Sequence, residues 1–131
     1  MTTIAPVEIT DEIRQFAREK IGSTAEPQFI TITPELGCKA GDCFMNVQNK
    51  VIREGGRIQF GWAIWEWPGA LLEAEHHAVY ASPENAQFID PTPCERGSRR
   101  RLFVPMIQQR TTSRTKEFCA TTFASRWLTI L

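Results

Sequence analysis

The sequence predicts a single α+β domain over residues 1–131, in which N-terminal helices pack on an antiparallel β-sheet. Apolar residues recur at helical spacing in the first part of the chain and then alternate at the two-residue spacing of strands. A length of 131 residues is enough to bury one hydrophobic core without disulfide bonds or a metal. Because neither an internal repeat nor a low-complexity segment marks a boundary, we expect one domain.

Two helices are expected before the sheet. The first lies between Thr10, a suitable N-cap, and Gly22, a residue type that readily ends a helix in the left-handed region. The second runs from Cys43 to Glu54 and is followed by two glycines. Its expected N-cap is Asp42, which places the cysteine at the first helical position.

Strands are expected where apolar and polar residues alternate or β-branched residues cluster. In chain order they are residues 28–33, 58–67, 71–80, 88–90 and 102–107. Pro68-Gly69 is a turn signal, so the two strands that flank it are expected to pair as antiparallel neighbours. Residues 116–131 fit either a strand or a helix, and both stay open.

The formal net charge is zero, but the charge is unevenly distributed. Residues 95–131 contain eight basic and two acidic side chains, which leaves this third at +6 and the rest of the chain at −6. The basic run Arg99-Arg100-Arg101 follows a Gly-Ser pair in an expected connection, where charges are usually solvated. We therefore expect no nucleic-acid partner.

The four cysteines would allow two disulfide bonds in an oxidising compartment. The first residues lack the basic and apolar regions of a signal peptide, and no segment approaches the roughly 18 apolar residues of a membrane span. We therefore expect free thiols in a cytoplasmic protein with no membrane contact. Cys94 and Cys119 are expected to act as small packing residues.

Cys43, His77 and Asp90 are the candidate catalytic residues, because they follow one another as nucleophile, base and carboxylate. A cysteine at a helix N-terminus faces the positive end of the helix dipole, which favours the nucleophilic thiolate. A histidine on a strand can hold the thiol proton, and a carboxylate on the next strand can orient the histidine.

The helix that starts with Cys43, the segment His77-Ala78-Val79-Tyr80 and the segment Asp90-Pro91-Thr92 resemble the papain-like cysteine superfamily in its transglutaminase-like arrangement. The similarity covers residues 36–93. It implies a papain-like or transglutaminase-like core with a Cys43-His77-Asp90 triad, and backbone amides at the helix start that stabilise an oxyanion. It also implies a thiol-dependent hydrolase or acyl transferase that acts on amide bonds of a peptide or protein substrate, without a cofactor. Cysteine peptidase, glutamine deamidase and transamidating activities stay open, as does the oligomeric state.

His76 is the alternative base, because adjacent residues of a strand point to opposite faces. The spacing of its apolar neighbours would turn His76 toward the core, whereas the resemblance assigns the role to His77. Trp62, Trp65 and Asn46 are candidate substrate-binding residues. Packing of the sheet and a polar helix face are the alternative interpretations of these three.

Two other classes of function are compatible with the sequence. Cys38, Cys43, Cys94 and one of the two histidines supply enough sulfur and imidazole ligands for tetrahedral zinc, although their spacing is not that of a short Cys-x-x-Cys pair. The second class is a catalytically silent module that binds a protein partner with its aromatic sheet or its basic C-terminal third. The intact Cys-His-Asp order favours the enzyme over both.

Overall fold

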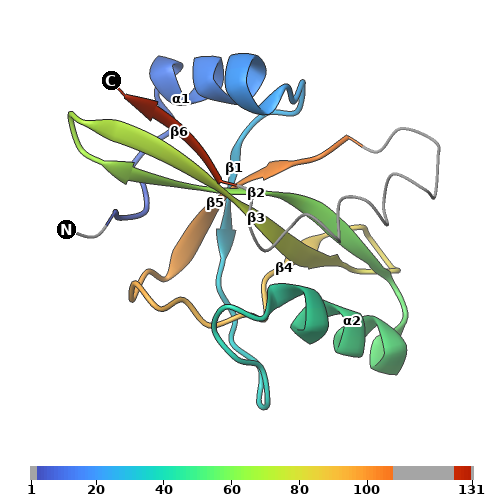
Figure 1. The fold of residues 1–131 in the computed structure, drawn as a ribbon. Helices are drawn as coiled ribbons and strands as arrows, with labels where there is room; N and C mark the ends of the chain where they lie inside the picture. Colours follow the sequence, from blue (N-terminus) through green and yellow to red (C-terminus); the bar gives the residue numbers. More distant parts are fainter. Residues whose placement is uncertain (1–2, 108–125, 131) are drawn as a thin grey trace.

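The computed structural model of the chain describes residues 3–107 and the backbone of residues 126–130 (Figure 1). Its elements in chain order are α1 (Asp11–Phe16), η1 (Ala17–Ile21), β1 (Gln28–Thr31), α2 (Cys43–Glu54), β2 (Arg57–Trp67), β3 (Leu71–Ala81), β4 (Phe88–Ile89), β5 (Arg100–Pro105) and β6 (Arg126–Ile130). The described residues form a small mixed domain of short helices and an antiparallel sheet, which confirms the expected α+β class. None of the described helices is long and apolar enough to cross a membrane.

The ends of the helices follow from local backbone chemistry. At the start of α1 the Thr10 side chain accepts a hydrogen bond of 3.2 Å from the amide of Ile13. The π-helical turn η1 continues α1 and ends at Gly22, whose φ of 78° lies in the left-handed region that glycine adopts without strain. α2 begins at Cys43 as expected, but the side chain of Asp42 makes no capping hydrogen bond.

The sheet is built around the long hairpin of β2 and β3, whose eleven residues each pair along their whole length. The strand order is β1-β5-β2-β3-β4, with β6 paired to β3, and all of these pairs are antiparallel. A parallel bridge between Ile32 and Asp90 connects the segment after β1 with the segment after β4. The first and last strands of the order therefore approach each other at this point.

The C-terminal third differs in part from the sequence predictions. β5 begins two residues before the strand expected at residues 102–107, because Arg100 and Arg101 pair with β1. In the ambiguous segment 116–131, residues 126–130 form a strand that pairs with β3. Residues 108–125 lie outside the described residues, and so does Cys119.

The two faces of the sheet carry different residues. The helix face packs against α1 and α2 in the larger hydrophobic cluster, to which the sheet contributes Phe60, Trp62, Ile64, Leu72, Ala74, Ala78, Tyr80, Leu102 and Val104. The opposite face carries a smaller cluster of Ile30, Val79 and Phe103. Because side chains alternate along β3, His76 shares the helix face with its partner Trp62, and His77 lies on the opposite face.

In the part of the chain that the structure describes, one edge of β3 contains a gap in strand pairing that includes His76 and His77. β6 pairs with the first five residues of β3, and β4 pairs with the last two. Within the described residues, no strand pairs with residues 76–79 on that edge. Cys43, at the start of α2, lines one cavity together with His76 and His77. A side chain from α2 therefore meets residues from both faces of the sheet at this gap.

Candidate active site

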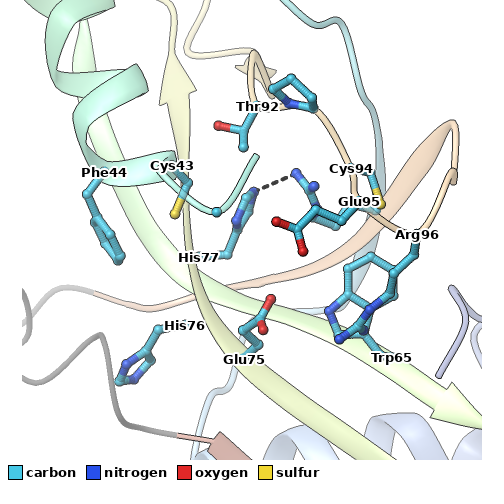
Figure 2. Close-up of a pocket in the computed structure, with 13 residues that line it drawn as sticks. Cys43, Phe44, Trp65, Glu75, His76, His77, Thr92, Cys94, Glu95 and Arg96 are labelled. Atoms are coloured by element: carbon cyan, nitrogen blue, oxygen red, sulfur yellow. Dashed lines mark hydrogen bonds between the residues drawn. The ribbon is translucent and has the colours of Figure 1, made fainter. Parts of the chain in front are cut away.

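The structure brings Cys43, His77 and Asp90 together, as the sequence pattern predicts. Cys43 is the first residue of α2, His77 lies in the middle of β3, and Asp90 directly follows β4. Cys43 and His77 line a cavity of about 290 Å³ (Figure 2). Asp90 is fully buried and contacts His77. A thiol, an imidazole and a carboxylate from three separate elements thus converge at one cavity.

Asp90 uses both carboxylate oxygens. Its Oδ2 lies 2.9 Å from Nε2 of His77, and its Oδ1 accepts a hydrogen bond of 3.1 Å from the backbone amide of Thr92. The second contact folds the Asp-Pro-Thr segment into a tight turn of the kind that an aspartate makes with the amide two residues later. The turn therefore holds the carboxylate in the orientation in which its other oxygen meets His77.

Burial and charge act in opposite directions on this pair. Burial favours the neutral imidazole, but the charges and hydrogen bonds of Asp90 and Cys43 outweigh it and raise the pKa of His77 from 6.5 to about 9. Burial also favours the neutral acid of Asp90, yet His77 and Arg101 lower the pKa of this carboxyl from its usual value. At neutral pH the pair is therefore an imidazolium and a carboxylate.

Arg101 belongs to the site, although it was not among the residues predicted from the sequence. It is only 4% exposed, it donates from Nη1 to Oδ2 of Asp90, and the same nitrogen lies 2.9 Å from Nε2 of His77. The expectation of solvated arginines is correct for Arg99 and Arg100, which are exposed, and wrong for Arg101. The available signal was strand alternation, which places Arg101 on the same face as the buried Phe103.

Asn46 connects α2 to the loop that carries Asp90. Its Nδ2 donates to the carbonyl of Lys39 at 2.9 Å and to Oγ1 of Thr92 at 3.0 Å, and its Oδ1 accepts from the amide of Lys39 at 3.2 Å. Thr92 is itself the residue whose amide binds Asp90. The buried side chain of Asn46 therefore fixes the start of α2, and with it Cys43, relative to the loop of Asp90.

The candidate substrate-binding residues lie in different places. Trp65 lines the cavity across from Cys43 (Figure 2), and the guanidinium of Arg96 lies 4.2 Å above its ring. Trp62 is buried on the helix face, where its ring centroid lies 3.8 Å from that of His76. Neither Trp62 nor the buried Asn46 lines the cavity. Of the three candidate substrate-binding residues, Trp65 is therefore the one that lies in the cavity wall.

The N-terminal end of α2 faces the cavity, because Gly41, Cys43 and Phe44 all line it. The first amide groups of a helix have no acceptor within the helix, and the Asp42 side chain does not cap them here. These amides carry the partial positive charge of the helix dipole. This end of α2 can therefore stabilise a negative charge that develops beside Cys43.

The cysteines in the described part of the chain are free thiols, as expected. Cys94, which was expected to be a small packing residue, is half-buried and lines the cavity. Cys38 does not line the cavity. Among the described residues, no three His, Cys, Asp or Glu side chains are grouped so that they could hold a metal ion. The ligand set considered for zinc is therefore not assembled there.

Comparison of the chain with protein-family models, with curated proteins and with solved structures gave no match. The likeness to papain-like and transglutaminase-like enzymes therefore depends on the motifs around Cys43, His77 and Asp90. What the site can do chemically has to be inferred from the geometry and charge of these residues and of Arg101.

Proposed function

We propose that the protein is a thiol-dependent hydrolase or acyl transferase that acts on amide bonds, with a papain-like or transglutaminase-like core. Cys43 is the nucleophile, His77 is the general base and acid, and Asp90 orients His77. The observation that carries the proposal is the buried contact of 2.9 Å between His77 and Asp90, beside a cavity that Cys43 also lines. Such a nucleophile, base and orienting carboxylate are the three parts of a catalytic triad.

The first step is the transfer of the thiol proton to His77. Nε2 of His77 is held by Asp90, which leaves Nδ1 as the nitrogen available to Cys43. The raised pKa of His77 favours the imidazolium, and the positive end of the α2 dipole can stabilise the negative charge that proton transfer leaves on the sulfur. The transfer therefore produces a thiolate–imidazolium pair, stabilised from the far side by the Asp90 carboxylate.

The chemical steps then follow from the positions of these groups. The Cys43 sulfur forms a bond to the amide carbonyl carbon, and the negative carbonyl oxygen is stabilised by amides of the first turn of α2. As the C–N bond breaks, Nδ1 of His77 gives its proton to the leaving nitrogen, which leaves a thioester on Cys43. His77 then takes a proton from the incoming acceptor, which forms a bond to the acyl carbon and releases the thiolate.

The acceptor decides the net reaction. Water gives hydrolysis of a peptide or deamidation of a glutamine side chain, and an amine gives transamidation. No cofactor is needed for these steps, because the thiolate, the imidazole and the helix amides supply the nucleophile, the proton and the anion stabilisation. Trp65 in the cavity wall offers an aromatic surface for the substrate backbone or side chain.

The reactivity of Cys43 tests the proposal without knowledge of the substrate. Wild-type protein, His77→Ala and His76→Ala are alkylated with iodoacetamide at pH 6, and the labelled cysteine is identified by mass spectrometry. His76→Ala is a matched control, since His76 is the adjacent residue and is similarly buried. An ordinary thiol is about 0.3% thiolate at this pH, so an ion pair makes labelling faster by a factor of about 100.

We expect this faster labelling at Cys43 in the wild type and in His76→Ala, and its loss in His77→Ala. A Cys43 that reacts no faster than Cys94 in the wild type would contradict the proposal. A zinc-binding protein would instead show one zinc per chain by metal analysis and protection of Cys43 from the reagent. A silent binding module would show slow labelling that neither histidine substitution changes.

A further inference from the structure

The contacts of Arg101 with Asp90 and His77 cannot all be hydrogen bonds at the same time. Nη1 of Arg101 and Oδ2 of Asp90 each lie 2.9 Å from Nε2 of His77, and Nη1 also donates to Oδ2. A guanidinium only donates hydrogen bonds, and a carboxylate only accepts them. Nε2 therefore bonds to Asp90 when it carries a proton and to Arg101 when it does not.

Proton transfer at Nδ1 leaves the proton on Nε2, so Nε2–H donates to Asp90 in both the neutral and the charged ring. In the imidazolium, however, the positive ring lies against the positive Arg101. Like charges at this distance disfavour the charged imidazole, and they are poorly screened because both side chains are about 5% exposed. Arg101 also neutralises part of the charge of Asp90 that His77 would otherwise feel.

From this arrangement, we propose that Arg101 is a positioning residue that holds Asp90 as a carboxylate while it limits the basicity of His77. The inference deepens the proposed function and rests on it, because a limited basicity matters only if His77 transfers protons. Without Arg101, the imidazolium would be stabilised by Asp90 with no opposing cation at Nε2. It would then release its proton to the leaving nitrogen less readily than it does with Arg101 present. A general acid works best when its pKa lies near the working pH.

Several charged or titratable groups contact the ring or line the cavity that it faces. They come from α2, β3, β5 and the loop after β4, and they are Cys43, Glu75, His76, Asp90, Cys94, Glu95, Arg96 and Arg101. Of the two cations in this set, Arg101 is the one with an atom at hydrogen-bond distance from the ring. Arg96 instead stacks on Trp65 and donates to Glu73. The inference therefore concerns Arg101 alone.

The test is an NMR titration of the His77 imidazole in a His76→Gln background, in which His77 is the one histidine of the chain. The titration compares wild-type Arg101 with Arg101→Gln, Arg101→Lys and Arg100→Gln. Glutamine keeps an N–H donor for Asp90 but removes the charge, and lysine keeps the charge. Arg100→Gln is the matched control, since Arg100 is the exposed neighbour on the same strand.

We expect Arg101→Gln to raise the midpoint of the His77 titration by about one pH unit or more, as the loss of a neighbouring cation does. Arg101→Lys should stay within about half a pH unit of the parent, and Arg100→Gln should leave the midpoint unchanged. If Arg101 only held Asp90 in place, Arg101→Gln would lower the midpoint toward the 6.5 of an ordinary histidine, and that result would overturn the inference. An unchanged midpoint would overturn it as well.

Two further measurements keep the outcomes separate. If Arg101→Gln does not fold, the result for Arg101→Lys decides. This variant retains the positive charge, so a change of more than one pH unit in the midpoint of the His77 titration would contradict the inference. The failure of the proposed function is recognised independently, by slow alkylation of Cys43 in the wild type. If the site is active, we expect the alkaline limb of its pH–rate profile to move to higher pH in Arg101→Gln by the same amount as the titration midpoint.

Discussion

His76 and His77 are neighbours on β3 with 8% and 5% of their surface exposed, yet the two faces of the sheet give them different surroundings. On the helix face, the ring of His76 lies against Trp62. On the opposite face, Nε2 of His77 meets a buried carboxylate and a buried guanidinium. The comparison shows that similar burial produces different chemistry. Asp90 and Cys43 raise the pKa of His77, whereas burial alone would lower it.

The two faces also differ in what stabilises them. The helix face is a continuous apolar cluster between the sheet and the helices, so its stability comes from buried apolar surface. The opposite face combines a small apolar cluster with the group of His77, Asp90 and Arg101. Because these three side chains carry charge, we expect the stability contributed by the opposite face to depend on pH and on the integrity of each charged group.

The largest effect is expected from Asp90→Asn, which removes the negative charge of the opposite face. Arg101 would then be a buried cation without its carboxylate, so the free energy of unfolding should fall by about 3–5 kcal/mol. Urea denaturation at pH 7 measures the change. The control is Glu54→Gln on α2, which breaks a pair of 2.9 Å with Lys50 at a half-exposed carboxylate and should lower stability by less than about 1 kcal/mol. Equal losses in the free energy of unfolding of both variants would show that the buried carboxylate of Asp90 stabilises the protein no more than the half-exposed carboxylate of Glu54 does.

A smaller effect is expected when pH is changed. The pKa of His77 is about 9 in the folded protein and near 6.5 in the unfolded chain, so its stabilising contribution is complete below about pH 6.5 and disappears as pH rises through 9. The free energy of unfolding should fall by up to about 3 kcal/mol across this interval. His77→Gln should remove this dependence, and His76→Gln should retain it. A wild-type curve that is flat between pH 6.5 and 9 would show that His77 does not hold its proton in the folded state.

Gly61→Ala tests how closely the opposite face is packed. Gly61 is paired with His77, and a Cβ there would lie 2.4 Å from the ring of Phe103 and from the carbonyl oxygen of Val104. We expect a loss of about 1–3 kcal/mol in thermal or urea unfolding and a shift of the His77 imidazole resonances. Gly69→Ala, in the hairpin turn with open space around it, should leave those resonances in place. Unperturbed resonances in Gly61→Ala would mean that packing there does not reach the site.

The smallest effect is expected from Asn46→Ala, which removes the hydrogen bonds between α2 and the loop of Asp90. The loss of these buried contacts should lower the free energy of unfolding by about 1–2 kcal/mol. Alkylation of Cys43 at pH 6 should slow, because the thiol is no longer held in line with His77. Asn49→Ala is the matched control, since Asn49 is an exposed residue of the same helix. If the two variants label at the same rate, Asn46 does not position the nucleophile.

Much of the fold could be predicted from local pattern. The bounds of α2 and the Pro-Gly hairpin of β2 and β3 follow from periodicity and from residue types that end helices and form turns. The pattern also selected Cys43, His77 and Asp90, since the order of residue types is visible along the chain. Apolar spacing turned His76 toward the core, and the resemblance selected His77. Because both faces of β3 are buried, spacing could not decide which histidine meets Asp90.

Arg101 and Asn46 show what the local pattern could not supply. Arg101 was expected to be solvated because its basic run follows a Gly-Ser pair in an expected connection. Pairing of its strand with β1 instead carries it into the interior, where Asp90 offsets the cost of its burial. Asn46 was considered for substrate binding, but its side chain is used within the structure, between Lys39 and Thr92. Both assignments depend on residues that are distant in the sequence.

The sequence by itself determined most of the elements before residue 100 and the Cys43, His77 and Asp90 of the candidate site, because helix ends, turns and alternation are properties of a few neighbouring residues. Only the tertiary structure decided which histidine meets Asp90, which arginine joins them and where the cavity opens. These outcomes depend on the register of β3 against its neighbours and on the gap that β4 and β6 leave along its edge. The physical reason is that charge and burial act through space, so the protonation of His77 is fixed by groups that adjoin it only after the chain has folded.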